Sequence, residues 1–211
     1  MDAVAEPSAR LAAELAVPGA DTWLCRQFVP PALADACLAR LGDELAWREE
    51  ALPLFGRRQL VPRLVAFYGD AGLSYRYSGL DHPALVWHPL LAALRRLLRR
   101  HLGSDFNCVL ANLYRDGDDC MGWHSDDEAA LGREPRIASL SFGASRDFLL
   151  RQRGDVRRRH CLLLEHGSLL LMEGCSQHGW QHCLPRRRRV RTPRINLTFR
   201  TLYPVAVDEH P

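Results

Sequence analysis

The sequence contains no lysine, because all 28 of its basic residues are arginines. Chemistry that depends on a lysine amine, such as Schiff-base formation or phosphate-loop binding, is therefore excluded. The seven cysteines include no C-x-x-C pair, and their odd number and irregular spacing argue against a disulfide framework or a zinc ribbon. We interpret them as reduced thiols of a cytoplasmic protein.

Long apolar runs are also missing. No stretch approaches the uninterrupted apolar length of a membrane span. The first 18 residues carry Asp2, Glu6 and Glu14 and lack the apolar segment of a secretory signal. We therefore expect a soluble monomer that does not associate with membranes.

The apolar pattern divides the 211 residues into a helical first part and a strand-rich second part. Apolar residues at near-helical spacing follow Pro30-Pro31, and a second amphipathic helix is predicted from Pro89 to Leu102. From Asn107 onward, short apolar runs predict strands over residues 108–114, 137–142, 147–151, 160–164, 168–172 and 194–202.

This order predicts an α+β fold with a mainly β core, a double-stranded β-helix (jelly roll) braced by N-terminal helices. We expect a flexible lead over residues 1–20, helices and a nucleotide-recognition lid over 21–106, a catalytic core over 107–203 and a tail over 204–211.

The most specific motif is His124-Ser125-Asp126 followed by a downstream histidine. Two histidines and one carboxylate form a three-ligand face for a non-haem Fe(II), which leaves coordination positions free for a co-substrate and O2. His178 and His182 would share one face of an extended segment, and spacing alone does not choose between them.

A strand over residues 194–200 would explain how a co-substrate is bound. Alternation would place Arg194, Asn196, Thr198 and Arg200 on one face and three apolar residues on the other. A guanidinium matches the oxygens of a carboxylate, so a small dicarboxylate that spans from metal to strand would be held at its far end. 2-Oxoglutarate has this chemistry.

Several segments together resemble the AlkB family of Fe(II)- and 2-oxoglutarate-dependent dioxygenases, in particular its branch that repairs alkylated bases in duplex DNA. The resemblance covers roughly residues 50–202. It is densest at residues 112–117, 124–128, 137–143, 166–170 and the final arginine strand.

The resemblance implies that His124, Asp126 and His182 bind iron and that Arg194 binds the distal carboxylate of 2-oxoglutarate. It also implies a supporting co-substrate site, which comprises Asn112, Tyr114, Asn196, Thr198 and Arg200.

The same resemblance implies a substrate site for a base removed from the duplex stack. Its residues would be an aromatic floor (Tyr75 and Tyr77), hydrogen-bond acceptors after the iron ligands (Asp127 and Glu128), an intercalating finger (Phe55), an entrance residue (Arg63) and a basic loop that grips DNA (Arg187, Arg188 and Arg189). For the arginine run alone, a solvated loop is an equal alternative to a polyanionic partner.

We therefore predict oxidative demethylation of 1-methyladenine and 3-methylcytosine in DNA, with release of formaldehyde and succinate, and we expect the DNA to be double-stranded. One alternative is an RNA or protein demethylase or hydroxylase of the same family. A second alternative is a nucleic-acid binding module that has lost catalysis.

Overall fold

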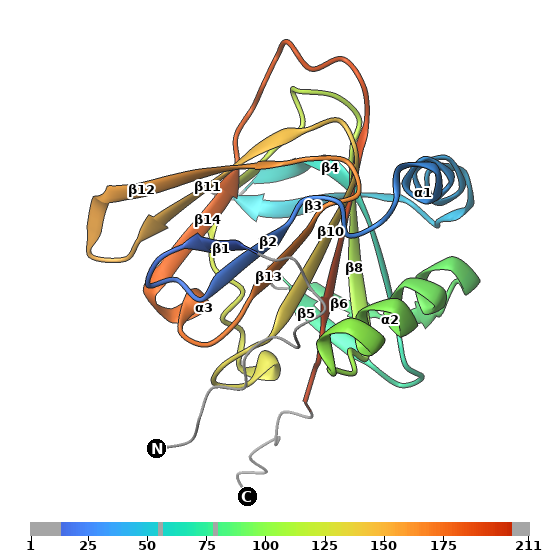
Figure 1. The fold of residues 1–211 in the computed structure, drawn as a ribbon. Helices are drawn as coiled ribbons and strands as arrows, with labels where there is room; N and C mark the ends of the chain where they lie inside the picture. The colour runs from blue at the N-terminus through green and yellow to red at the C-terminus, as the bar shows by residue number, and fades with distance from the viewer. Residues whose placement is uncertain (1–13, 55–56, 78–79, 204–211) are drawn as a thin grey trace, which may run out of the picture.

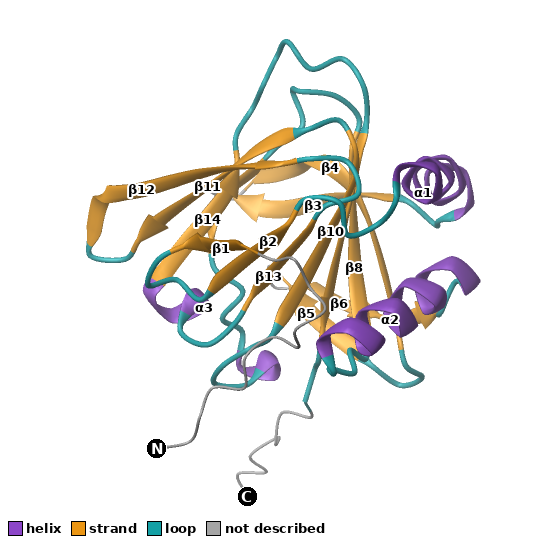
Figure 2. Cartoon of the chain, in the orientation of Figure 1, coloured by secondary structure: helices purple, strands orange, loops and turns teal. Residues whose placement is uncertain are grey.

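The computed structural model describes residues 14–54, 57–77 and 80–203. Strands dominate this part of the chain (Figure 2). The strands are β1 (Glu14–Val17), β2 (Thr22–Cys25), β3 (Arg48–Leu54), β4 (Arg57–Gly69), β5 (Ser74–Tyr77), β6 (Leu80–Pro83), β7 (Leu85–Val86), β8 (Cys108–Tyr114), β9 (Met121–His124), β10 (Ile137–Gly143), β11 (Arg146–Gln152), β12 (Asp155–Leu164), β13 (Leu169–Met172), β14 (Trp180–Leu184) and β15 (Arg194–Arg200).

Two long helices, α1 (Pro31–Glu44) and α2 (Pro89–Leu102), agree with the sequence prediction. Each begins with a proline in its first turn, where the missing N–H leaves no intrahelical bond unmade. The His88 ring accepts a hydrogen bond from the Leu90 N–H, and α2 ends at Gly103 with φ 68°. A short helix, α3 (Ser176–Gly179), and a 3-10 turn (Ala129–Leu131) complete the described helices.

The larger sheet runs in the order β1-β2-β13-β10-β15-β8-β4-β3, and β7 pairs with β4. Both long helices lie on one side of this sheet, on the right in Figure 1. The side chains of α1 and α2 bury an apolar core against the sheet, with β15 contributing Ile195, Leu197 and Phe199.

The smaller sheet runs in the order β12-β11-β14-β9 and lies against the other side (Figure 1). A second core fills the space between the two sheets, where Phe148, Leu150 and Trp180 of the smaller sheet meet Ile137 and Met172 of the larger one. Two packed sheets of mainly antiparallel strands confirm the predicted jelly roll. Strands β5 and β6 form a separate hairpin.

Strand β15 shows how the alternation of side chains creates the site. All seven of its residues are buried. Its apolar residues face the helices, whereas Arg194, Asn196, Thr198 and Arg200 line a cavity between the sheets. The predicted two-faced strand is therefore confirmed.

Two organisational expectations need correction. Residues 14–17, which we assigned to a flexible lead, form β1 and pair with β2. Strands β3 and β4 lie in the segment that we assigned to helices and a lid, yet β4 pairs with β8 in the larger sheet. The larger sheet therefore crosses the boundary that we expected at residue 106. Within the described residues, every helix is too short or too polar to cross a membrane.

Candidate active site

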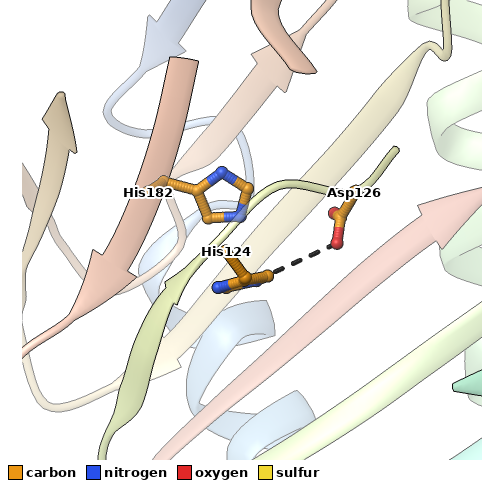
Figure 3. Close-up of side chains that lie close together, drawn as sticks. All are labelled: His124, Asp126 and His182. Atoms are coloured by element: carbon orange, nitrogen blue, oxygen red, sulfur yellow. Dashed lines mark ion pairs between the residues drawn. The ribbon is translucent and has the colours of Figure 1, made fainter. Parts of the chain in front are cut away.

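Three side chains that could hold a metal ion meet between the two sheets. Strands β9 and β14 are antiparallel neighbours, and their pairing places His182 directly opposite His124. Asp126 follows two residues after His124. One ligand atom of each residue lies within 4.8 Å of the others, and His124 Nε2 is 3.9 Å from Asp126 Oδ1 (Figure 3).

Hydrogen bonds and packing orient these ligands. The His124 Nδ1 lies 2.9 Å from the Gly122 carbonyl oxygen, which can only accept, so Nδ1 carries the proton. His124 Nε2 then carries no proton, and its lone pair can bind a metal. The His182 ring stacks on Phe148 with a centroid distance of 5.1 Å. The Asp126 N–H donates to Gln177 Oε1 over 2.9 Å, which fixes the ligand loop to α3.

The protonation states suit a cation. Burial lowers the pKa of His182 to about 3, so its imidazole is neutral at physiological pH. Burial alone would raise the pKa of Asp126, but the charge of Arg200 and the hydrogen bond that Arg200 donates hold it below its usual range. A carboxylate and two neutral imidazoles are the donor set of a non-haem Fe(II) centre.

His178 does not belong to this cluster. It lies in α3 and is exposed, because residues 176–179 form a helical turn and not the extended segment that would have aligned it with His182. Within the described residues, the only cluster with metal-binding geometry comprises His124, Asp126 and His182. The choice of His182 over His178 therefore agrees with the geometry.

Arg194 supplies a buried positive charge in the same cavity. Its guanidinium lies 5.4 Å from the centre of the Tyr114 ring and donates to Ser141 Oγ over 2.9 Å. Burial lowers the pKa of Arg194 to about 10, so it remains charged at neutral pH. Among the described residues no carboxylate pairs with it, and its buried Nε has no hydrogen-bond partner. A carboxylate ligand would satisfy both the charge and the unmade bond.

The remaining predicted co-substrate residues also line this cavity. Asn112 and Tyr114 project from β8, beside β15, where Asn196 pairs with Asn112 in register. Thr198 Oγ1 donates to Asn196 Oδ1 over 3.1 Å, and Arg200 binds Asp126. The geometry thus brings all of the predicted metal and co-substrate side chains to one cavity, and their individual roles stay predictions.

Sequence reasoning missed two serines that support the cavity, and it did not predict the contact that Arg63 makes there. Ser141 accepts from Arg194, and Ser139 Oγ accepts from Asn196 Nδ2 over 2.8 Å. Arg63 donates from Nε to Asn112 Oδ1 over 2.7 Å and is only 2% exposed. The two serines are two residues apart in a strand that the sequence predicts, so alternation could have identified them.

The predicted substrate residues are less uniformly placed. Arg63 lies beside the cavity and is buried against Asn112. Asp127 forms an ion pair with Arg153, in which both side chains are about 40% exposed. Glu128 directly precedes the 3-10 turn at residues 129–131. Their substrate contacts stay predictions.

The structure does not describe the side chains of three aromatic residues that we predicted in the substrate site. Phe55 lies outside the described residues. Tyr75 and Tyr77 belong to β5, which pairs with β6, but their side chains are not described. Their proposed roles as finger and floor stay predictions from the sequence.

The predicted basic loop follows β14 and is held in place by its backbone. The Arg187 N–H donates to the Gly117 carbonyl over 2.7 Å, and the Gly117 N–H donates to Val190 over 2.9 Å. A Cβ at Gly117 would lie 1.8 Å from the Arg187 carbonyl oxygen, so only glycine fits. Arg187 also pairs with Asp147, and the exposed Arg188 lies 3.6 Å from Asp118.

A buried arginine also holds this loop in place. Arg146 is 1% exposed and donates to the carbonyls of Asp116, Asp119 and Pro185 over 2.8 to 3.0 Å. Its guanidinium also lies over the Tyr114 ring at 5.8 Å. Arg146 therefore links the loops that contain Asp116 and Pro185 to Tyr114, which lines the cavity.

Comparison with known proteins gives a family match. The model of the 2OG-Fe(II) oxygenase superfamily matches residues 21–200. The human protein "Alpha-ketoglutarate-dependent dioxygenase alkB homolog 3" is 43% identical over 190 residues, which cover 84% of this chain and 64% of the relative. The mouse "DNA oxidative demethylase ALKBH2" is 44% identical over 181 residues, which cover 81% of this chain and 76% of the relative.

The chain spans slightly under two thirds of the homolog 3 proteins, 66% of the bovine and 64% of the human one. A solved structure titled "The structure of OsALKBH1" superposes with a TM-score of 0.59 at 18% identity and covers 90% of this chain and 99% of that one. At this identity the likeness concerns the fold alone.

Proposed function

The chain belongs to the 2OG-Fe(II) oxygenase superfamily and within it to the AlkB homologs, and we propose that it oxidatively demethylates N-alkylated bases in DNA. The cofactors of this superfamily are Fe(II), 2-oxoglutarate and O2. One observation carries the catalytic part of the proposal. Within the described residues, a His-Asp-His cluster lines the same buried cavity as an arginine whose Nε has no hydrogen-bond partner.

Iron with 2-oxoglutarate and O2 supplies the oxidation of a substrate C–H bond, with succinate and CO2 as products of the co-substrate. His124, Asp126 and His182 would hold the metal, and Arg194 would bind the distal carboxylate. Arg194 is anchored by Ser141, and Arg200 anchors Asp126, so both functional groups are oriented before any ligand binds.

The cavity wall controls access of water. Apolar side chains of the two sheets, including Met121, Phe148, Met172 and Leu184, line the cavity between the polar groups. The side chain of His124 is 25% exposed, whereas that of Asp126 is 3% exposed, so the cavity opens at His124. A substrate would therefore reach the metal from the side of His124 and exclude solvent as it binds.

DNA is the proposed substrate because two lines of observation converge on it. The name of the ALKBH2 relatives describes a DNA oxidative demethylase. The basic loop presents Arg186, Arg188 and Arg189 as exposed charges, which suit phosphate groups. Phosphate contacts of this kind add affinity without base preference, so base selection would occur in the cavity.

The lesions that we propose are 1-methyladenine and 3-methylcytosine, whose positive charge would suit Asp127 or Glu128. Hydroxylation of the N-methyl group would release formaldehyde and restore the base. We also propose a preference for duplex DNA, because the segment at Phe55 carries an apolar residue followed by glycine and two arginines. Such a segment is suited to filling the space left by a flipped base.

The decisive experiment is release of formaldehyde from a DNA duplex with one 1-methyladenine, in the presence of Fe(II), 2-oxoglutarate and O2. Matched single-stranded DNA, RNA and a methylated peptide would be tested in parallel. Turnover of the DNA substrates supports the proposal. Faster turnover of RNA or peptide would favour the alternative substrate classes. Absence of both formaldehyde and 2-oxoglutarate consumption would favour a catalytically silent binding module.

A further inference from the structure

An apolar groove adjoins the mouth of the cavity. It lies where β9, the edge strand of the smaller sheet, faces the first half of β4 in the larger sheet. Its described lining residues are Gln59, Leu60, Val61, Pro62, Arg63, Cys120, Met121, Gly122, Trp123 and His124. His124 and Met121 also line the cavity, so the groove and the metal site share a wall.

An exposed leucine and a half-buried tryptophan make this surface unusual. Leu60 is 60% exposed although it is a large apolar residue. Trp123 lies in the groove with the guanidinium of Arg151 over its ring, 4.2 Å from the centroid. Gln181 also holds that guanidinium, since its Oε1 accepts from Arg151 Nε over 3.0 Å and from Nη2 over 2.8 Å.

The charge around the groove points to an anionic partner. No aspartate or glutamate is among its described lining residues, and the guanidinium of Arg151 lies over the ring of Trp123 beside it. A flat apolar surface with an aromatic ring and a fixed guanidinium is the combination that binds single nucleotides, because the base stacks and the phosphate is attracted.

The position of the groove selects which nucleotide it would hold. His124 forms the mouth of the cavity and part of the groove, so a base at the metal site and a base in the groove would be close together. Consecutive bases of one strand meet this requirement directly. A base of the opposite strand would have to cross the duplex to reach it.

We propose that the groove between β4 and β9 is a binding site for the base next to the lesion on the same strand, with Trp123 as the stacking residue. Arg151 and Gln181 position the Trp123 ring, and Leu60 closes the opposite wall. The proposal rests on the proposed function, because it assumes that a nucleic-acid base enters the metal site.

The test is a thermodynamic cycle, in which one mutation and one change to the oligonucleotide are made separately and together. Fluorescence anisotropy measures the Kd of the metal-free protein for a single-stranded oligonucleotide with one 1-methyladenine. Trp123→Ala should weaken binding on the order of tenfold, which is typical for loss of one base–aromatic stack. Replacing one flanking base with an abasic site should weaken wild-type binding by a similar factor. The two changes together should weaken binding no further than either alone.

Matched variants separate stacking from folding. Trp123→Phe keeps a ring and should retain most of the affinity. Leu60→Ala changes an exposed side chain of the groove and should weaken binding, whereas Leu33→Ala changes a leucine that is 46% exposed on α1, away from the groove, and should not. Gln181→Ala frees Arg151 and should weaken binding less than Trp123→Ala.

The outcomes distinguish this inference from the proposed function. If wild-type protein releases formaldehyde but the Trp123→Ala and abasic effects on Kd are additive at both flanking positions, the groove does not bind a neighbouring base. Equal affinity of wild type, Trp123→Ala and Leu60→Ala would also overturn it. If the cycle in Kd is non-additive but no formaldehyde is released from any substrate, the groove assignment stands and the catalytic proposal fails.

Discussion

Arg200 donates a 2.8 Å hydrogen bond from Nη2 to Oδ2 of Asp126, and both side chains are buried. Asp126 is one of the three metal-binding candidates, and Arg200 lies on the strand that also carries Arg194. Strand β15 therefore supports the metal site at one end and the proposed co-substrate site at the other. A displacement of this strand would disturb both sites together.

The first prediction concerns this ion pair. Arg200→Gln should reduce metal affinity by about 10- to 100-fold, because the partner that orients the ligand is lost. It should also reduce the free energy of unfolding by about 3–5 kcal/mol in the metal-free protein, since a buried carboxylate loses its partner. Metal titration and urea unfolding measure the two effects. Arg96→Gln, on the exposed face of α2, is the control and should change neither quantity.

The second prediction compares two histidines four residues apart. His182→Ala should abolish formaldehyde release and weaken Fe(II) binding, because one of three ligands is removed. His178→Ala should leave both unchanged, because His178 lies in α3 outside the cluster. Binding of Fe(II) under anaerobic conditions and a formaldehyde assay provide the readouts. Activity in His182→Ala, or its loss in His178→Ala alone, would contradict the assignment.

The third prediction concerns the co-substrate. Arg194→Ala should weaken 2-oxoglutarate binding by about 2–5 kcal/mol, because a buried charged partner of the carboxylate is removed. The side chain of Arg191, three residues earlier, is exposed, so Arg191→Ala should have little effect on this step. Calorimetric titration of 2-oxoglutarate into the metal-loaded protein measures the difference. Similar affinities in the two variants would exclude Arg194 as the carboxylate ligand.

The fourth prediction is a pH dependence of stability in the metal-free protein. The pKa of His182 is about 3 in the folded protein, against its usual 6.5, because burial disfavours the charged ring. Below pH of about 6.5 the unfolded chain takes up a proton that the folded chain does not. The free energy of unfolding should therefore fall as the pH decreases toward 3, by up to about 1.4 kcal/mol per pH unit.

Denaturant unfolding at several pH values in the presence of a chelator measures this slope. The Asp126 carboxyl contributes in the same direction at lower pH, since its pKa in the folded protein is depressed and its stabilisation is lost on protonation. His182→Gln removes the imidazole and should flatten the dependence between about pH 6.5 and 4. An unchanged slope in this variant would show that other groups cause it.

The fifth prediction rests on the sequence alone. Phe55→Ala should reduce turnover of a methylated duplex more than turnover of the same base in a single strand, because only the duplex has to be opened. The ratio of the two kcat/KM values is the measured quantity. Equal losses on both substrates would remove the intercalating role.

Much of the sheet could be predicted because its strands are buried and apolar. The sequence predicts residues 108–114 and 137–142 as strands, and the structure has β8 at Cys108–Tyr114 and β10 at Ile137–Gly143. Strand β4 was missed because Arg57, Arg58, Gln59 and Pro62 interrupt its apolar pattern. Its strand structure depends on pairing with β3 and β8, and this pairing cannot be predicted from the local order of apolar residues.

The site also has parts that a local sequence pattern predicts and parts that depend on the pairing of strands. The ligand triplet and the arginine strand are local patterns, so their chemistry could be predicted from the order of residues. The stack of Arg151 on Trp123 could not, because the two residues are far apart in the chain and meet only through the pairing of β9, β14 and β11. Spacing alone could not separate His178 from His182, which the resemblance favours, because the helical turn of α3 is not evident from the local pattern.

The backbone pairing between Gly117 and the loop that carries Arg187 has a consequence for nucleic-acid association. Arginine-rich segments that bind anions are often unstructured beforehand and lose chain entropy when they associate. Here the main chain is ordered in advance, so association would restrict side-chain rotamers alone. Substituting the arginines should therefore alter the attraction to phosphate and its dependence on salt, while the loop retains its conformation.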